Sequence, residues 1–215
     1  MSPRKAPLKE NSPPIFLHDE KIRQNYSVVA GLDEAGRGPL AGPVVAAAVV
    51  LPSGLVIEGV RDSKKVTEKE RKNIFWDIVK MADAVGVGIV EADTIDRINI
   101  LQSTMRAMGM AVEDLGIKPD ILLIDAVKLR ETGIKQESII RGESVSSSIA
   151  AASIIAKVVR DDIMTGYHEK YPAYNFKRHK GYSTREHMMN IQKCGPCPIH
   201  RKSFRKVMDI KLPLG

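Results

Sequence analysis

The sequence predicts an α/β or α+β domain in which helices cover the faces of a mixed central sheet. Two apolar, β-branched segments, SVVAGLDE and PVVAAAVVL, flank a turn rich in Gly and Pro, and this pattern predicts two neighbouring strands. Further along the chain, short apolar runs alternate with longer segments whose apolar residues recur at helical spacing. Strands that alternate with helices are typical of a sheet with helices packed on its faces.

Each remaining element is predicted by a local pattern. Short strands are expected, in order, in GLVIEGV, AVGVGIVE, PDILLIDAV and ESIIRGES. The segment TEKERKNIFWDIVKMA is expected to be a helix, because Thr67 and Glu70 form a capping box ahead of apolar residues at helical spacing. Other helices are expected in FLHDEKIRQN before the first strand, in ADTIDRINILQSTMRAMGMAVEDLG as one helix or two, in VSSSIAAASIIAKVVRDDIMTGYHEKY, and near TREHMMNIQKC.

Length and local composition suggest how the chain is divided. A chain of 215 residues suits one domain with a small appendage. Residues 1–26 are expected to form a disordered leader and a short helix, because the opening segment is polar and rich in Pro. The main domain is expected over residues 27–170, and a basic part of helices and loops over residues 171–215 is expected to pack against it.

The composition argues against a membrane protein or a secreted protein. The chain contains no apolar run of the ~20 residues that a transmembrane helix requires, and its first residues lack the apolar core of a secretory signal. A cytoplasmic protein is therefore expected. Cys194 and Cys197 stand in CGPC, for which two reduced thiols in a Gly-Pro turn are the favoured interpretation and half of a zinc site is the alternative.

Positive charge is concentrated near the C-terminus. The formal net charge of the chain is +7. Residues 177–206 contain nine Lys or Arg and one acid, Glu186, so this segment alone carries +8. Such a basic surface attracts polyanions, nucleic acid first, through the release of counterions. Charge alone is equally compatible with a solvated surface that only keeps the protein soluble.

Four carboxylates stand at the ends of predicted strands or just beyond them: Asp33, Glu34, Asp125 and Glu143. One such residue is more often a cap or a salt bridge than a ligand. Several on neighbouring strands would repel one another and would need divalent cations to hold them together. Oxygen ligands favour Mg²⁺ or Mn²⁺ over zinc, and two such ions about 4 Å apart can clamp the attacking and leaving oxygens of a phosphodiester.

The segment that carries the first two acids raises a geometric question. Consecutive strand residues point to opposite faces, so Asp33 and Glu34 could share a metal only if the strand ends irregularly, which the following glycines would permit. Asp33 is the expected bridging ligand. The backbone N–H groups of Gly36-Arg37-Gly38 could bind phosphate or sugar oxygens, and a tight turn with Arg37 paired to a neighbouring acid is the alternative.

These residues belong to a pattern that closely resembles ribonuclease HII, the bacterial type 2 ribonuclease H. The run GLDEAGRGPLAGPVVAAAV matches the signature of that family. The resemblance continues, in order, through RDSKKVTEKER, LLIDAV, SIAAASIIAKVVRD, HKGYST and GPCPIHRKSF. It spans about residues 27–206, which is nearly everything outside the leader.

The resemblance implies an RNase H-like fold, a mixed sheet flanked by helices, with a helical C-terminal extension that helps to grip a duplex. It implies an endonuclease that cuts the RNA strand of RNA/DNA hybrids and also cuts 5′ of a single ribonucleotide embedded in duplex DNA. The products would carry 3′-hydroxyl and 5′-phosphate ends, and two Mg²⁺ or Mn²⁺ ions would take part. We expect these duplexes to be the partners, no membrane association, and a monomer.

The resemblance also implies roles for individual residues. Asp33, Glu34 and Asp125 match the metal-binding carboxylates, and Glu143 in RGES stands where the family usually has Asp. The segment Gly36-Arg37-Gly38 and Tyr182 match the residues that detect the 2′-hydroxyl at the RNA–DNA junction. Apart from the resemblance, five basic residues could contact phosphates, and a solvent-exposed charge is the alternative for each: Lys64, Lys65, Lys180, His200 and Arg201.

Three alternatives remain beside this interpretation. A nucleic-acid-binding module without catalysis could use the same scaffold. Ribonuclease HIII is the closest enzymatic alternative, but it carries a long N-terminal domain, and only about 26 residues precede the first predicted strand here. Asp161 and Asp162 could be further metal ligands, although a helical salt bridge between Lys157 and Asp161 is favoured by their spacing.

Overall fold

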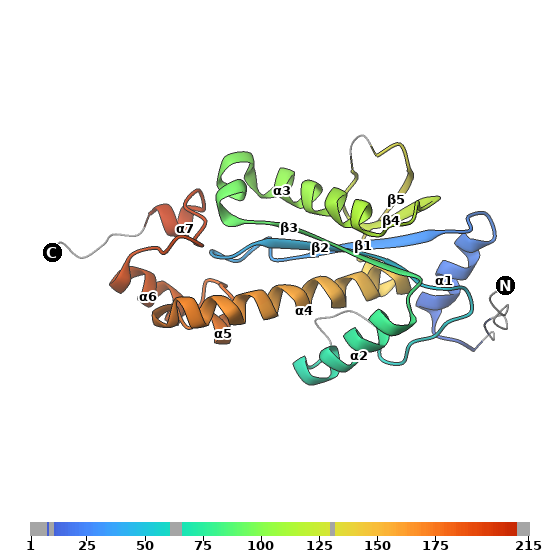
Figure 1. Cartoon of the computed structure of the whole chain (residues 1–215), viewed down its shortest axis with the longest axis horizontal. Helices are drawn as coiled ribbons and strands as arrows, with labels where there is room; N and C mark the ends of the chain where they lie inside the picture. Colours follow the sequence, from blue (N-terminus) through green and yellow to red (C-terminus); the bar gives the residue numbers. More distant parts are fainter. Residues whose placement is uncertain (1–7, 9–10, 61–65, 130–131, 210–215) are drawn as a thin grey trace.

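The fold is a five-stranded mixed sheet with helices on both faces (Figure 1). The computed structural model describes residues 8, 11–60, 66–129 and 132–209. The strands lie in the order β3-β2-β1-β4-β5, where β2 is antiparallel to β1 and β3, and β4 is parallel to β1 and β5. Their bounds are β1 Val29–Ala35, β2 Val44–Val50, β3 Ala84–Val90, β4 Ile121–Asp125 and β5 Lys135–Ile139. The predicted mixed sheet flanked by helices is confirmed.

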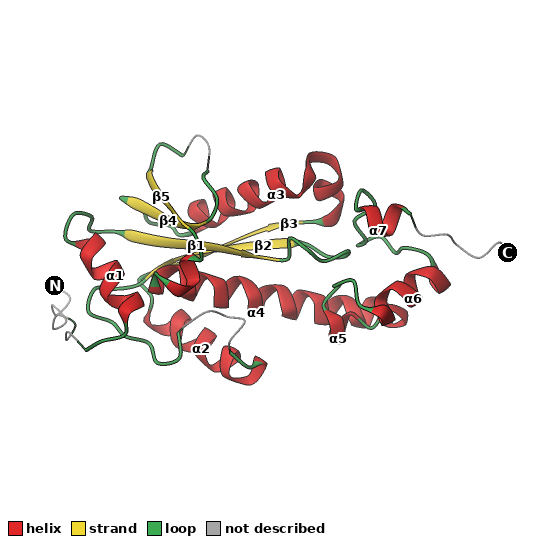
Figure 2. Cartoon of the chain, turned by 180° about the vertical axis from the view of Figure 1, so that it is seen from behind, coloured by secondary structure: helices red, strands yellow, loops and turns green. Residues whose placement is uncertain are grey.

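Helices α3 and α4 run along opposite faces of the sheet, and α2 packs beside α4 (Figures 1 and 2). The short helices α5, α6 and α7 gather at the C-terminal end of α4, and α1 lies at the other end of the molecule. No helix in the described part of the chain is both long and apolar enough to span a bilayer. The helix bounds are α1 Pro14–Arg23, α2 Glu68–Met81, α3 Ala92–Asp114, α4 Ser147–Lys170, α5 Phe176–His179, α6 Arg185–Cys194 and α7 Arg205–Met208.

Small residues let α4 approach the sheet closely. The first half of α4 is rich in Ala and Ser, and Ala150, Ala151 and Ala152 are fully buried. On the strand beneath, a Cβ added to Gly31 would lie 2.1 Å from the backbone carbon of Ser148, so only glycine fits there. This contact fixes the start of α4 directly over β1, two residues before Asp33.

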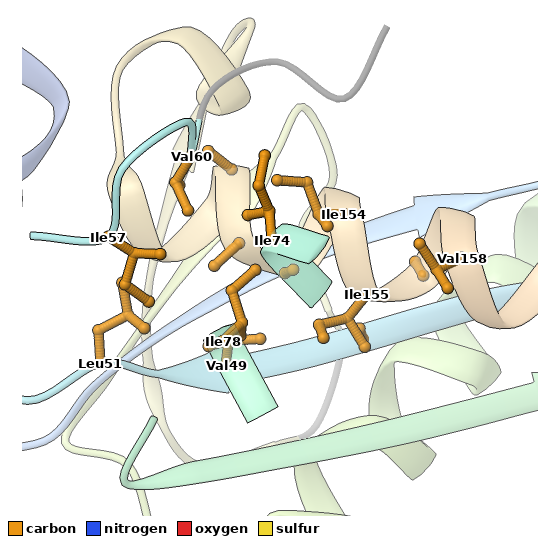
Figure 3. Packing of buried hydrophobic residues seen from close by; sticks show 14 of the residues in the cluster. Val49, Leu51, Ile57, Val60, Ile74, Ile78, Ile154, Ile155 and Val158 are labelled. Carbon is orange, nitrogen blue, oxygen red and sulfur yellow. The ribbon is translucent and has the colours of Figure 1, made fainter. Parts of the chain in front are cut away.

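Apolar side chains from three elements fill the space between α4, α2 and β2 (Figure 3). Ile74 and Ile78 reach into this core from α2, Ile154 and Ile155 from α4, and Val49 from β2. The predicted capping box begins α2, because the Thr67 side chain accepts from the backbone N–H of Glu70 and the Glu70 side chain accepts from that of Thr67. The helix is thus held at both its start and its apolar face.

Two local predictions require correction or refinement. The segment GLVIEGV is not a strand: its residues form turns whose apolar side chains, Ile57 and Val60, complete the core against α2. Both edges of β2 are already paired, with β1 and β3, so no edge of that strand was left for it. The long helix predicted as one or two is continuous in its bounds but interrupted at Asn99, whose φ of 66° is not helical.

Candidate active site

A cleft of about 290 Å³ lies where β1 and β4 end, beside the first turns of α4. It brings together eight of the residues that the sequence singled out. These are Asp33, Glu34, Gly36, Arg37, Gly38, Asp125, Glu143 and Tyr182. Ala35, Arg71, Ser153 and Lys157 complete its lining. Residues more than 100 positions apart in the sequence therefore share one surface.

The strand register sets the direction of the first two acids. Asp33 pairs with Ala47, which packs in the core beneath α4, and Glu34 pairs with Ala46, which packs in the core beneath α3. Because paired residues share a face of the sheet, Asp33 faces α4 and Glu34 faces α3. The ladder with β2 continues through Ala35, so the prediction of an irregular strand end at these acids is wrong.

Glu34 nevertheless reaches the cleft because the neighbouring strand stops early. The parallel pairing of β1 with β4 ends at Leu32 and Ile124, and β4 itself ends at Asp125. Beyond that point no strand among the described residues pairs with β1 on this side, so a side chain on either face can turn into the opening. Asp33 and Glu34 both line the cleft from opposite faces of one regular strand.

The other two acids are held by short hydrogen bonds. The backbone N–H of Gly142 donates to Asp125 Oδ1 at 2.8 Å, which links the end of β4 to the 3₁₀ turn Gly142–Ser144. Within that turn, Glu143 Oε2 accepts from the Ser153 hydroxyl of α4 at 3.1 Å. Glu143 is only 7% exposed, and it faces the same cleft as Asp33 and Asp125.

Burial and nearby negative charges perturb the first two carboxyls. Burial and the charges of Glu34 and Asp125 raise the pKa of Asp33 well above its usual range, against a hydrogen bond from the Glu34 N–H at 2.7 Å. Burial also raises the pKa of Glu34, although Arg37 donates to its Oε1 at 3.3 Å and opposes the shift. The other oxygen, Glu34 Oε2, is buried and lacks a hydrogen-bond partner among the described residues.

These features fit a site for hard divalent cations. All four acids supply oxygen ligands, the type that Mg²⁺ and Mn²⁺ prefer, and a cation would relieve the repulsion that raises the pKa of Asp33. It would also give the unpaired Glu34 oxygen a partner. Within the described ranges, no three Asp, Glu, His or Cys side chains already converge tightly enough to hold an ion.

The glycine segment and the tyrosine form the wall of the cleft nearest the C-terminal part. Gly36 has a φ of +99°, which favours glycine, and a Cβ there would lie 2.1 Å from Arg160 Nε. Gly38 faces open space. Tyr182 is 44% exposed, and Lys157 Nζ lies 5.8 Å from the centre of its ring. The wall thus presents exposed backbone beside an exposed aromatic ring.

The structure contradicts direct phosphate contact for two predicted basic residues. His200 and Arg201 are 1% and 0% exposed, so neither can reach a phosphate on the surface. Lys180 is partly exposed, and its ammonium donates to the Thr165 hydroxyl at 2.8 Å. Lys64 and Lys65 lie outside the described residues.

His200 belongs instead to a buried network behind Tyr182. Its Nε2 lies 3.0 Å from His187 Nε2, and His187 Nδ1 lies 2.9 Å from the backbone oxygen of Tyr182. At the other end, His200 Nδ1 accepts from the backbone N–H of Cys197 at 2.9 Å. Burial lowers the pKa of both histidines to about 4, so both are neutral at pH 7 and support the segment that carries Tyr182.

Sequence reasoning missed Ser153, Lys157 and Arg160 as a group. They occupy one side of α4 at spacings of four and three residues, and this periodicity was the available signal. The predicted ion pair between Lys157 and Asp161 is confirmed at 2.7 Å, so Asp161 is engaged in a helical salt bridge. Arg71 was not singled out either, and no local pattern connects it with the cleft.

Comparisons with known proteins agree with this geometry. The family model for ribonuclease HII matches residues 30–207. The ribonuclease HII of Acetivibrio thermocellus is 56% identical over 187 residues, covering 87% of this chain and 73% of that protein. Ribonuclease H2 of Pyrococcus horikoshii has a TM-score of 0.71 at 27% identity, covering 85% of this chain and 96% of that one. The Mn²⁺ complex of Bst-RNase HIII, 22% identical with a TM-score of 0.62, shares the fold over 84% of this chain and 68% of its own. The chain therefore belongs to the ribonuclease HII family, and it is a ribonuclease H endonuclease.

Proposed function

We propose that the enzyme cuts the RNA strand of RNA/DNA hybrids and cuts 5′ of single ribonucleotides embedded in duplex DNA, leaving 3′-hydroxyl and 5′-phosphate ends. One observation carries the proposal. Asp33, Glu34 and Asp125 line the same cleft as Gly36–Gly38 and Tyr182. The carboxylates that would hold divalent cations thus adjoin a wall of backbone N–H donors and an aromatic ring. Hydrolysis and recognition of a ribose would take place side by side.

The acids would hold two Mg²⁺ or Mn²⁺ ions, which when bound activate water and neutralise charge on the scissile phosphate. Asp33 is the proposed shared ligand, because its carboxyl feels the charges of both Glu34 and Asp125. Glu143 is the proposed fourth ligand, direct or through water, and the Ser153 hydroxyl fixes its orientation. Lys157, paired with Asp161, lines the cleft where a phosphate would enter.

Recognition of the ribose would come from the wall of the cleft formed by Gly36–Gly38 and Tyr182. A 2′-hydroxyl both donates and accepts hydrogen bonds, and it distinguishes RNA from DNA. The N–H groups of Arg37 and Gly38 form no hydrogen bond with another described residue, so they are available as donors. Tyr182 could stack beneath the sugar or the adjacent base. Lys180, Lys64 and Lys65 are proposed to contact phosphates.

The test uses a DNA duplex that contains one ribonucleotide, with Mg²⁺ and Mn²⁺ in parallel. The wild type should cut 5′ of the ribonucleotide, and Asp33→Asn should lose cleavage by about a thousandfold or more while it still binds the duplex. Asp83→Asn, at an exposed acid outside the cleft, is the matched control and should cut normally. Wild-type cleavage by Asp33→Asn would remove the metal assignment. Cutting of long hybrids alone would indicate a specificity like that of ribonuclease HIII.

A further inference from the structure

Two fully buried arginines, Arg160 and Arg201, hold the loop that contains Gly36–Gly38. Both are 0% exposed, and neither forms a salt bridge with a carboxylate of the described residues. Their donors are used on backbone oxygens instead. Arg201 donates from Nη2 to Gly36 O at 2.6 Å, from Nη1 to Arg37 O at 3.0 Å and Pro39 O at 2.8 Å, and from Nε to Gly42 O at 3.0 Å.

These bonds determine where the neighbouring N–H groups point. In a planar trans peptide, the carbonyl oxygen and the N–H of the next residue lie on opposite sides. Arg201 binds the oxygens of Gly36 and Arg37, so the N–H groups of Arg37 and Gly38 point away from its guanidinium. Both residues are exposed and line the cleft, and neither N–H has an acceptor in the described part of the chain.

Arg160 ties the same loop to the segment that carries Tyr182. It donates to Pro43 O at 3.0 Å, to Ala41 O at 3.1 Å, and to Lys180 O at 3.1 Å. Lys180 precedes Tyr182 by two residues. One guanidinium is therefore bonded both to the loop that contains Gly36–Gly38 and to the segment that carries Tyr182. The Gly36 backbone lies directly against Arg160, because a Cβ at Gly36 would clash with Arg160 Nε.

We infer that Arg201 is a positioning residue for substrate recognition: it orients the Arg37 and Gly38 N–H groups toward the ribose in the cleft without touching substrate itself. This inference rests on the proposed function. Arginine suits the task because its planar fork offers five N–H donors in fixed directions. Lysine keeps the charge but donates from a single nitrogen, and it cannot hold four carbonyl oxygens that surround a guanidinium plane.

The test compares Arg201→Lys with Arg97→Lys, a matched change at a 69% exposed arginine whose ion pair with Asp93 lies outside the cleft. We expect Arg201→Lys to lose between about tenfold and a hundredfold in kcat/KM on the single-ribonucleotide duplex, because misplacement by about an ångström costs that much. Its affinity for Mn²⁺ should stay unchanged, and the amide NMR signals of Arg37 and Gly38 should move. Arg97→Lys should match the wild type in all three.

Several outcomes would overturn the inference. One is a folded Arg201→Lys with wild-type kinetics; another is an equal loss of Mn²⁺ affinity, which would make Arg201 a general structural residue. If Arg201→Lys does not fold, the amide NMR signals of Arg37 and Gly38 are compared in the wild type with and without the bound duplex, in the presence of Ca²⁺. Unchanged amide signals of Arg37 and Gly38 would then exclude the orientation, and shifted signals would support it. If the wild type cuts only long hybrids, the proposed function fails separately, and the same variants are compared on that hybrid.

Discussion

Two groups of charged side chains, the acids that line the cleft and the arginines buried behind its wall, are stabilised in different ways. Arg160 and Arg201 are surrounded by backbone oxygens, three around the first and four around the second. Asp33 is instead disfavoured by burial and by the charges of Glu34 and Asp125, and Glu34 Oε2 has no partner among the described residues. Buried charges that are fully hydrogen-bonded form a scaffold, whereas buried charges left partly unpaired are suited to bind a cation.

The difference has a functional meaning. In the proposed function the arginines would hold the Gly36–Gly38 loop in place before substrate arrives. The acids are instead disfavoured by burial and by nearby negative charge, and the proposed cations would relieve this cost. Removing the charge of a buried arginine should therefore lower the free energy of unfolding, and removing the charge of Asp33 should raise it.

The largest effect on stability is expected from Arg160→Met. This change removes a buried cation and leaves the oxygens of Ala41, Pro43 and Lys180 without their donor. Each buried unsatisfied group costs about 1–3 kcal/mol, so the free energy of unfolding should fall by about 3 kcal/mol or more. Urea unfolding followed by circular dichroism measures this loss. A loss comparable to that of the exposed control Arg97→Met would show that the arginine is not part of the scaffold.

A smaller effect of opposite sign is expected from Asp33→Asn in the absence of divalent cations. The pKa of Asp33 is raised in the folded state, so the folded protein binds more protons and loses stability as pH rises above the unfolded pKa of about 4. At pH 7, removing the charge should stabilise the protein by on the order of 1 kcal/mol. The variant should also lose part of the decline in stability with rising pH. Thermal melts at several pH values measure the effect, with Asp83→Asn as the control. Equal melting temperatures of Asp33→Asn and Asp83→Asn at every pH would contradict the predicted stabilisation.

Much of the fold and the cleft was predictable because the signals are local. Alternating strands and helices, the Thr67 capping box and the acids at strand ends all follow from nearby residues. The strand end at Glu34 was predicted wrongly, because its regularity depends on pairing with β2 and on the early end of β4. The residues around Glu34 carry no information about how far β1 pairs with β2 or about where β4 ends.

The roles of the buried basic residues could not be predicted for a different reason. Charged side chains are mostly exposed, so Arg201 was expected on the surface and near phosphate. Its actual partners precede it by about 160 residues, at Gly36 and Gly42, and they are backbone oxygens that no sequence pattern distinguishes. The contact between the neutral side chains of His187 and His200 could not be predicted for the same reason.

Calorimetric titration with Mn²⁺ tests most directly whether the unpaired acids form the cation site. The wild type and Asp83→Asn should bind Mn²⁺ with the same affinity, and Asp33→Asn should bind at least about tenfold more weakly, because it removes the carboxylate that we propose as the shared ligand. Asp33→Asn that is folded and binds Mn²⁺ with wild-type affinity would contradict the account.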